Sequence, residues 1–405
     1  MKKILIVWLL LLFCVRLNAQ EIDKEKMDSL FTLIESKGKG MGSISLFQDG
    51  NEVYHNSFGY ADIENNIEAT EMTKYRIGSV SKIFTATIIM QLVDEKKLSL
   101  ETTIDQYFPN LPNVNKITIE QLLRHRSGLH NFTDDEDYLS WMESPQTKSE
   151  LIEIFIEKGS DFEPNEKFEY SNTNYVLLSF IAEDTDNKSF SDILKSRIIE
   201  PLELKKTYYG DKINTRENEA LSYTKLKEWH LSTETDMSVP VGAGAIASTP
   251  SDLNIFLNNL FTGNLVSKKS LKKMKDIIEG YGIGMIQIPF YDKKSFGHTG
   301  GIDGFQSMAS YFPEENFSIS YCSNGVVMPR NDILIGALSI YFEKDYQLPD
   351  FKPGIELTSE DLDQYLGIYS SPSFPLKITI SKDNNILIAQ ATGQSSFPLD
   401  AYEKD

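Results

Sequence analysis

The side chains with the clearest chemical potential are a serine and a lysine three residues apart, Ser79 and Lys82. They stand where a polar segment enters an apolar run that predicts a helix continuing to about Glu95. At this spacing both side chains lie on one helical face, about one turn apart. An uncharged lysine amine could take the serine proton, and the helix N-terminus would favour negative charge beside it.

The spacing alone does not select this pair. The same Ser-x-x-Lys pattern occurs four times, at Ser36/Lys39, Ser79/Lys82, Ser222/Lys225 and Ser270/Lys273. Ser79 could also simply cap its helix, with Lys82 a solvated neighbour. The chemistry assigned to Ser79 therefore depends on motifs that lie further along the chain.

Two such motifs are present, Tyr-Ser-Asn at residues 170–172 and His-Thr-Gly at residues 298–300. Each has a structural alternative, because Asn172 is a good helix cap, Tyr170 can pack, and His298 can be a hydrogen-bonded strand residue. The five histidines are scattered and show none of the spacings typical of zinc ligands. We therefore expect no metal and no cofactor.

Taken in order, the three motifs resemble those of the penicillin-recognising serine hydrolases. The most similar branch, peptidase S12-like, holds class C β-lactamases, D-alanyl-D-alanine carboxypeptidases, D-aminopeptidases and esterases. Residues 122–129 read Leu-Leu-Arg-His-Arg-Ser-Gly-Leu, where the family usually has threonine in place of Arg126. Residues 242–253 and 281–285 are also similar to family sequences, and the resemblance spans roughly residues 44–324.

The resemblance implies catalytic roles for four residues. Ser79 would attack a carbonyl and form an acyl-enzyme, with Lys82 shuttling its proton. Tyr170, its phenol acidified by nearby cationic groups, would act as the base. The backbone N–H groups of Ser79 and Gly301 would form the oxyanion hole.

The resemblance also implies substrate-binding roles. Asn172 would hold the substrate amide and orient Lys82, and the carboxylate or other polar end would face His298, Thr299 and Gly300. Many relatives carry lysine at the histidine position, which supplies a fixed cation, whereas histidine is charged only part of the time near neutral pH. His125, in the flanking motif, is expected to be structural, and Arg126 to be solvated or paired.

Three functions remain open. The first is a serine hydrolase that resembles a D-Ala-D-Ala carboxypeptidase, a D-aminopeptidase or an esterase. The second is a class C-type β-lactamase, and the third is a catalytically silent homologue that binds penicillin or wall peptide. The histidine at position 298 favours the first, because class C β-lactamases usually have lysine there. The expected partner is a small-molecule or peptide substrate: a D-amino-acid peptide, a β-lactam or an ester.

Strands and helices that could position these motifs are spread along the chain. Strands are predicted at residues 42–48, 52–60, 282–289, 304–312 and 317–323, with mostly helical sequence between them. This order predicts an α+β fold (an α/β sandwich), in which an antiparallel sheet built from both ends of the domain is flanked by helices. The fold expected from the resemblance is β-lactamase/transpeptidase-like, with an all-helical subdomain and a small C-terminal β segment.

The chain divides into four predicted parts. Residues 1–19 have the basic start and short apolar core of a cleaved signal peptide, so we expect secretion into the periplasm. Residues 20–345 form the hydrolase domain and residues 346–354 a proline-containing linker. Residues 355–405 resemble the start of a lipocalin-like β-barrel that is apparently truncated.

The formal net charge is −19, which argues against nucleic acid as a partner because phosphates would be repelled. No later segment is long and apolar enough to span a membrane. The composition gives no indication of the oligomeric state.

Overall fold

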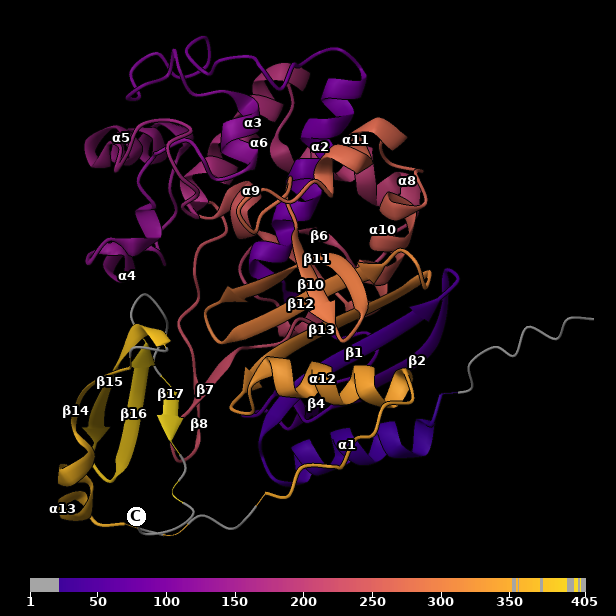
Figure 1. The fold of residues 1–405 in the computed structure, drawn as a ribbon, viewed down its shortest axis with the longest axis vertical. Coiled ribbons are helices and arrows are strands. Elements are labelled where there is room, and N and C mark those ends of the chain that lie inside the picture. The colour runs from indigo at the N-terminus through magenta and orange to yellow at the C-terminus, as the bar shows by residue number, and fades with distance from the viewer. Residues whose placement is uncertain are drawn as a thin grey trace, which may run out of the picture.

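The centre of the molecule is a six-stranded sheet in which every neighbouring pair is antiparallel (Figure 1). The computed structural model describes residues 22–351, 355, 357–371, 374–391, 397–399 and 401. Along the sheet the strands are β10 (Ile286–Phe290), β11 (Lys293–Ile302), β12 (Phe305–Phe312), β13 (Phe317–Val326), β1 (Gly40–Gln48) and β2 (Asn51–Phe58). The pairing of β13 with β1 joins the two ends of the domain, as the sequence predicted.

Helices cover both faces of this sheet. On one face lie α1 (Lys24–Ser36) and α12 (Arg330–Tyr341), whose apolar side chains share one buried cluster with the sheet. On the other face lie α2 (Ser81–Asp94), α6 (Asn172–Asp186) and α10 (Pro250–Phe261), which belong to a second, larger cluster (Figure 1). The predicted α+β fold class is therefore confirmed.

Local sequence signals account for the main boundaries. Asp49 and Gly50, with φ of 51° and 78°, form the two-residue turn between β1 and β2, which requires positive φ at both positions. Helix α10 begins after Thr249, whose side chain accepts a hydrogen bond from the Asp252 N–H, and Pro250 occupies its first position.

Short elements complete the domain beside the main sheet. The short strands are β3 (Tyr60–Asp62), β4 (Ile67–Glu68), β5 (Tyr75–Arg76), β6 (Tyr208–Tyr209), β7 (Tyr223–Lys225), β8 (Trp229–Leu231) and β9 (Ile246–Ser248). The remaining helices of this domain are η1 (Gly78–Val80), α3 (Ile119–Leu123), η2 (Phe132–Asp134), α4 (Tyr138–Trp141), α5 (Lys148–Lys158), α7 (Phe190–Leu194), η3 (Lys195–Ile199), α8 (Glu200–Leu202), η4 (Thr215–Glu217), α9 (Val241–Gly244) and α11 (Lys268–Met274). Most of these helices lie above the sheet in Figure 1.

One strand of the main sheet was not among those predicted. Strand β11 carries the His-Thr-Gly motif and pairs with β10 and β12. The sequence of this strand contains three glycines, at positions 297, 300 and 301, which are poor strand formers. These glycines allow close backbone contacts, so the alternating pattern that usually identifies a strand is missing.

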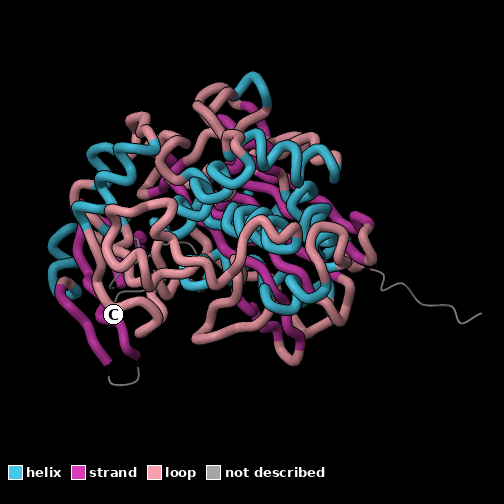
Figure 2. The backbone as a smooth tube through the Cα atoms, turned by 90° about the horizontal axis from the view of Figure 1, so that it is seen from above, coloured by secondary structure: helices cyan, strands magenta, loops and turns pink. Residues whose placement is uncertain are grey.

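A separate four-stranded sheet lies at one side of the molecule in both views (Figures 1 and 2). It comes after α13 (Ser359–Leu362) and consists of β14 (Gly367–Ser371), β15 (Phe374–Asp383), β16 (Ile386–Ala391) and β17 (Phe397–Leu399). These strands lie within residues 355–405, where a small C-terminal β segment was expected. Residues 1–19, the expected signal peptide, lie outside the described residues, as do parts of the expected linker and barrel segment.

Within the described ranges, no helix combines the length and apolar character needed to cross a membrane.

Candidate active site

Ser79 lies in the short turn η1, directly before α2 and against strand β11. Its neighbours Gly78 and Val80 are buried, whereas Ser79 is partly exposed. Gly78 has φ of 48°, and a Cβ there would come within 2.8 Å of the backbone of Gly301. The absence of a side chain at Gly78 therefore lets the backbone of η1 touch the backbone of β11.

The hydroxyl of Ser79 lies between the two other predicted catalytic side chains. Its Oγ is 3.0 Å from Lys82 Nζ and accepts a hydrogen bond from Tyr170 Oη at 2.9 Å. Lys82 Nζ also donates to Asn172 Oδ1 at 2.8 Å and to the Ala243 carbonyl at 2.9 Å. The structure therefore brings together four side chains that are up to 93 positions apart in sequence.

Lys82 is fully buried, and this burial holds the pKa of its amine well below the usual value. Among the described residues, no carboxylate forms an ion pair with it. The charged amine can donate to Ser79, Asn172 and Ala243 together, whereas the uncharged form would keep Asn172 and Ala243 as acceptors and leave one lone pair for the Ser79 proton. The arrangement suits a lysine that works as a base.

Tyr170 is held in a cluster of aromatic rings. Its ring centroid is 4.3 Å from that of His125 and 6.2 Å from that of His298. Burial raises the pKa of the Tyr170 phenol, and the hydrogen bond with Ser79 offsets this only in part. The pKa of the phenol is therefore raised, not lowered as the resemblance implied, because burial outweighs the hydrogen bond with Ser79.

Asn172 is the first residue of α6, and its amide is fixed on both sides. Its backbone N–H donates to Asn131 Oδ1 at 2.8 Å, and its Nδ2 donates to Thr133 Oγ1 at 3.0 Å. The Oδ1 atom is thereby turned toward Lys82. Asn172 thus makes the contact that the orienting role implied by the resemblance requires, from a position set by Asn131 and Thr133, which the motifs did not single out.

His298 does not carry the partial positive charge that was expected. Its side chain is buried, and burial lowers its pKa to about 3. Nδ1 faces the Thr299 carbonyl, so it carries the proton, while Nε2 accepts from Tyr281 Oη at 3.0 Å. At neutral pH His298 is a neutral, hydrogen-bonded part of the wall of the site.

The three residues after His298 differ in exposure. Thr299 is partly exposed, Gly300 is buried, and Gly301 is exposed with no atom closer than 4.0 Å to an added Cβ. A Cβ at Gly300 would lie 2.1 Å from the Ile77 carbonyl oxygen. Gly300 thus serves close packing, and Gly301 presents backbone to open space beside Ser79.

His125 and Arg126 occupy the structural positions expected of them. The buried ring of His125 accepts a hydrogen bond from the Ser171 N–H at 3.1 Å. Arg126 pairs with Glu279 and donates to Asn165. The sequence motifs did not single out Tyr281 and Ala243 as contacts of the site, although both lie in the family-like stretches 281–285 and 242–253.

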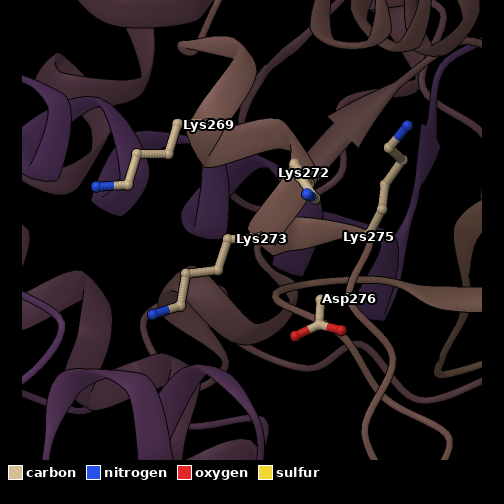
Figure 3. Close-up of a pocket in the computed structure, with 5 residues that line it drawn as sticks. All are labelled: Lys269, Lys272, Lys273, Lys275 and Asp276. Carbon is tan, nitrogen blue, oxygen red and sulfur yellow. The ribbon is translucent and has the colours of Figure 1, made fainter.

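No group of three or more His, Cys, Asp or Glu side chains within the described part of the chain could hold a metal ion. A surface hollow of about 590 Å³ lies elsewhere, beside α11, lined by Lys269, Lys272, Lys273, Lys275 and Asp276. Its lysine side chains point in different directions rather than toward one spot (Figure 3). None of them belongs to the Ser79 cluster.

The fold and the serine-centred cluster define a class of protein, and comparison with known proteins agrees that this one is a serine hydrolase. The family model described as Beta-lactamase matches residues 32–338, and the chain belongs to this family.

Individual relatives give a more detailed comparison. Penicillin-binding protein 4* of Bacillus subtilis (strain 168) is 26% identical over 358 residues, which are 81% of this chain and 78% of that protein. Teichoic acid D-alanine hydrolase of Staphylococcus aureus (strain MRSA252) is 25% identical over 62% of this chain, which spans 59% of the relative. The structure of D-amino acid amidase from Ochrobactrum anthropi SV3 with L-phenylalanine amide superposes with a TM-score of 0.72. It is 29% identical, and the match covers 79% of this chain and 98% of the amidase.

Proposed function

We propose that this protein is an exported hydrolase that cleaves amide or ester bonds of D-amino acids through an acyl-enzyme on Ser79. The observation that carries the proposal is the position of Ser79 Oγ between Lys82 Nζ and Tyr170 Oη, at 3.0 and 2.9 Å. A nucleophile with an adjacent base and an adjacent proton donor has what acyl transfer requires.

Acylation begins with Lys82. Burial lowers the pKa of its amine, and in the proposed mechanism the uncharged form of Lys82 accepts the hydroxyl proton as Ser79 Oγ attacks the carbonyl carbon. The carbonyl oxygen becomes an oxyanion, which accepts hydrogen bonds from the backbone N–H groups of Ser79 and Gly301. The backbone contact of Gly78 with Gly301 holds these two donors near each other.

Tyr170 then acts as the proton donor. Its phenol stays protonated, so it can give a proton to the leaving amine or alkoxide as the bond breaks, and Lys82 returns its proton to Tyr170. In deacylation, water attacks the Ser79 ester and gives one proton to Lys82, and Lys82 passes that proton to Ser79 Oγ as the ester bond breaks. In this assignment Lys82 is the base and Tyr170 is the proton donor, whereas the family resemblance implied Tyr170 as the base and Lys82 as a proton shuttle.

The neutral wall of the site indicates the substrate class. An uncharged His298 supplies no fixed cation for a carboxylate, which favours amides and esters without a carboxylate at that end. Two relatives are named a D-amino acid amidase and a D-alanine hydrolase, which supports a D-amino-acid acyl group. A penicillin-binding or β-lactamase activity is the second candidate, since the family is described as Beta-lactamase and one relative as a penicillin-binding protein.

Intact-mass analysis with two probes tests the nucleophile. We expect a fluorophosphonate to add once to the wild-type protein and not to the Ser79→Ala variant, and penicillin G to react slowly or not at all. D-phenylalanine amide should be hydrolysed and L-phenylalanine amide should not. Labelling that persists in Ser79→Ala would overturn the assignment of Ser79, and penicillin turnover faster than D-amide turnover would favour the second candidate.

Export and domain division form part of the proposal. We propose that residues 1–19 are removed on secretion, and that residues 20–345 form the hydrolase domain. Residues 346–354 then link it to a barrel-like segment at 355–405. N-terminal sequencing of the mature protein from a periplasmic fraction tests the cleavage, and an intact Met1 there would contradict it.

A further inference from the structure

We propose that Arg76 and Asp303 position the oxyanion hole. Their buried ion pair holds the turn between β11 and β12 against η1, and so sets the distance between the backbone nitrogens of Ser79 and Gly301. The inference rests on the proposed function, because an oxyanion hole matters only if Ser79 is the nucleophile. Neither residue belongs to the three motifs, and neither contacts Ser79.

Arg76 lies three residues before Ser79, in β5, and its side chain is only 4% exposed. Nη1 donates to Asp303 Oδ2 at 3.2 Å and to the Thr235 carbonyl at 2.7 Å. Nη2 donates to Glu234 Oε1 and to the Asp211 carbonyl, both at 3.0 Å. The guanidinium therefore ties the nucleophile segment to three other parts of the chain.

Asp303 lies two residues after Gly301, at the first position of the Asp-Gly turn between β11 and β12. It has φ of 52°, which such a turn requires, and its side chain is fully buried. Oδ1 accepts from the Thr235 N–H at 3.0 Å and from Thr235 Oγ1 at 2.7 Å. Arg76 and Asp303 thus both form hydrogen bonds with Thr235. These shared bonds fix the tip of the β11–β12 hairpin.

Between these two anchors, the backbones of η1 and β11 touch. Ser307 Oγ donates to the Ile77 carbonyl at 2.7 Å, and added Cβ atoms at Gly78 and Gly300 would collide with the opposite segment. Gly78 and Gly300 themselves contribute no side chain to this contact, although Arg330 Nη1 donates to the Gly300 carbonyl at 3.2 Å. The Arg76–Asp303 pair supplies a side-chain tether just beyond them.

The consequence concerns geometry rather than binding. Oxyanion-hole donors act only when they are preorganised around the place where negative charge develops. If the hairpin tip is released, Gly301 N can move relative to Ser79 N while the substrate pocket keeps its walls. Loss of the tether should therefore lower kcat and leave KM nearly unchanged.

The test compares Asp303→Asn with wild type in the full chain, using hydrolysis of p-nitrophenyl acetate. The asparagine keeps the size and the acceptor for Thr235 but removes the charge that faces Arg76. We expect kcat to fall about 10- to 100-fold with KM within about threefold, because one oxyanion donor is displaced. Affinity for phenylboronic acid, whose adduct with Ser79 mimics the tetrahedral intermediate, should fall by a similar factor. Active-site titration with a fluorophosphonate normalises the rates to folded enzyme.

The matched control is Glu234→Gln, which removes the other carboxylate that pairs with Arg76. The Glu234 side chain is 31% exposed. The kcat of this control variant should stay within about twofold of wild type, because the tether to the hairpin remains. If Asp303→Asn does not fold, Arg76→Lys supplies the test, since it keeps the charge and loses the forked contacts; kcat should again fall and KM should not.

A folded Asp303→Asn enzyme with wild-type kcat and boronic acid affinity would overturn the inference while leaving the proposed function intact. A loss confined to KM would also overturn it. Full activity in Ser79→Ala would instead remove the proposed function, and with it the oxyanion hole itself.

Discussion

Arg76 and Lys82 stand three residues before and three residues after Ser79, and both are buried bases. Their partners differ. Arg76 has two carboxylates in contact, Asp303 at 3.2 Å and Glu234 at 3.0 Å. Lys82, by contrast, has three uncharged oxygen atoms as its hydrogen-bond partners in the part of the chain that the structure describes, and burial pushes its pKa well below the usual value.

Residue type and partners together, rather than the depth of burial alone, account for the different states of these two side chains. An arginine does not lose its proton inside a protein, so carboxylates such as Asp303 and Glu234 stabilise the buried charge of Arg76. A lysine can lose it, so a buried lysine without carboxylates becomes neutral. The region around Arg76 is thereby suited to holding structure, and the region around Lys82 to accepting a proton.

Replacing Lys82 by arginine should have the largest effect of the changes considered. The Lys82→Arg variant would place a permanent positive charge at a site with no paired carboxylate among the described residues, and it would remove the proposed base. We expect kcat/KM to fall about 10⁴-fold or more, with no recovery as the pH is raised. Fluorescence-detected unfolding checks that the variant is folded at the assay temperature. Activity within tenfold of wild type would show that Lys82 is not the base and would return that role to Tyr170.

The next effect comes from removing the charge at Arg76. Arg76→Met leaves Asp303 buried without its cation, and breaking a buried pair in this way typically costs about 3–5 kcal/mol of unfolding free energy. Urea titration measures it. The matched control is Lys116→Met, whose pair with Glu163 is exposed and should contribute less than about 1 kcal/mol. Equal small losses in both variants would mean that the Arg76 pair is not a structural tether.

Much of this organisation was predictable from the sequence. The order of the three motifs predicted which of four Ser-x-x-Lys patterns would meet Tyr170 and Asn172, and strands were predicted at residues 42–48 and 52–60, where β1 and β2 lie. Thr249 and Pro250 are likewise residue types typical of a helix start. These features depend on local residue chemistry, which a sequence displays directly.

Protonation states and tertiary partners were not predictable. The sequence suggested cations that would acidify Tyr170 and a partly charged His298, but burial raises the first pKa and lowers the second. Burial is a property of the assembled fold. The Arg76–Asp303 pair, separated by 227 positions, and the glycine-rich strand β11 give no local signal either.

A smaller effect tests the neutral state of Lys82 through the pH dependence of stability. With a folded pKa far below the unfolded value of about 10.4, Lys82 binds a proton in the unfolded chain only, so stability should increase as pH rises. Between pH 7 and 9 the wild type should gain about 1 kcal/mol per pH unit relative to Lys82→Met. Urea titrations at each pH give the two curves. Parallel curves would mean that Lys82 keeps its proton in the folded enzyme.

The smallest expected effect concerns His298, a third buried base whose contacts include no carboxylate. With a pKa of about 3, it is neutral throughout the assay range, so it cannot set the acid limb of the pH–rate profile. In His298→Gln we expect kcat to fall about threefold to tenfold from lost packing, with the midpoint of the acid limb unmoved. A pH profile of kcat/KM for both enzymes measures it. A shifted midpoint would place a titrating His298 in the reaction. An unmoved midpoint would mean that His298 is neutral in the assay range. His298 would then resemble Lys82, whose pKa is also lowered by burial at a site where no described carboxylate pairs with it.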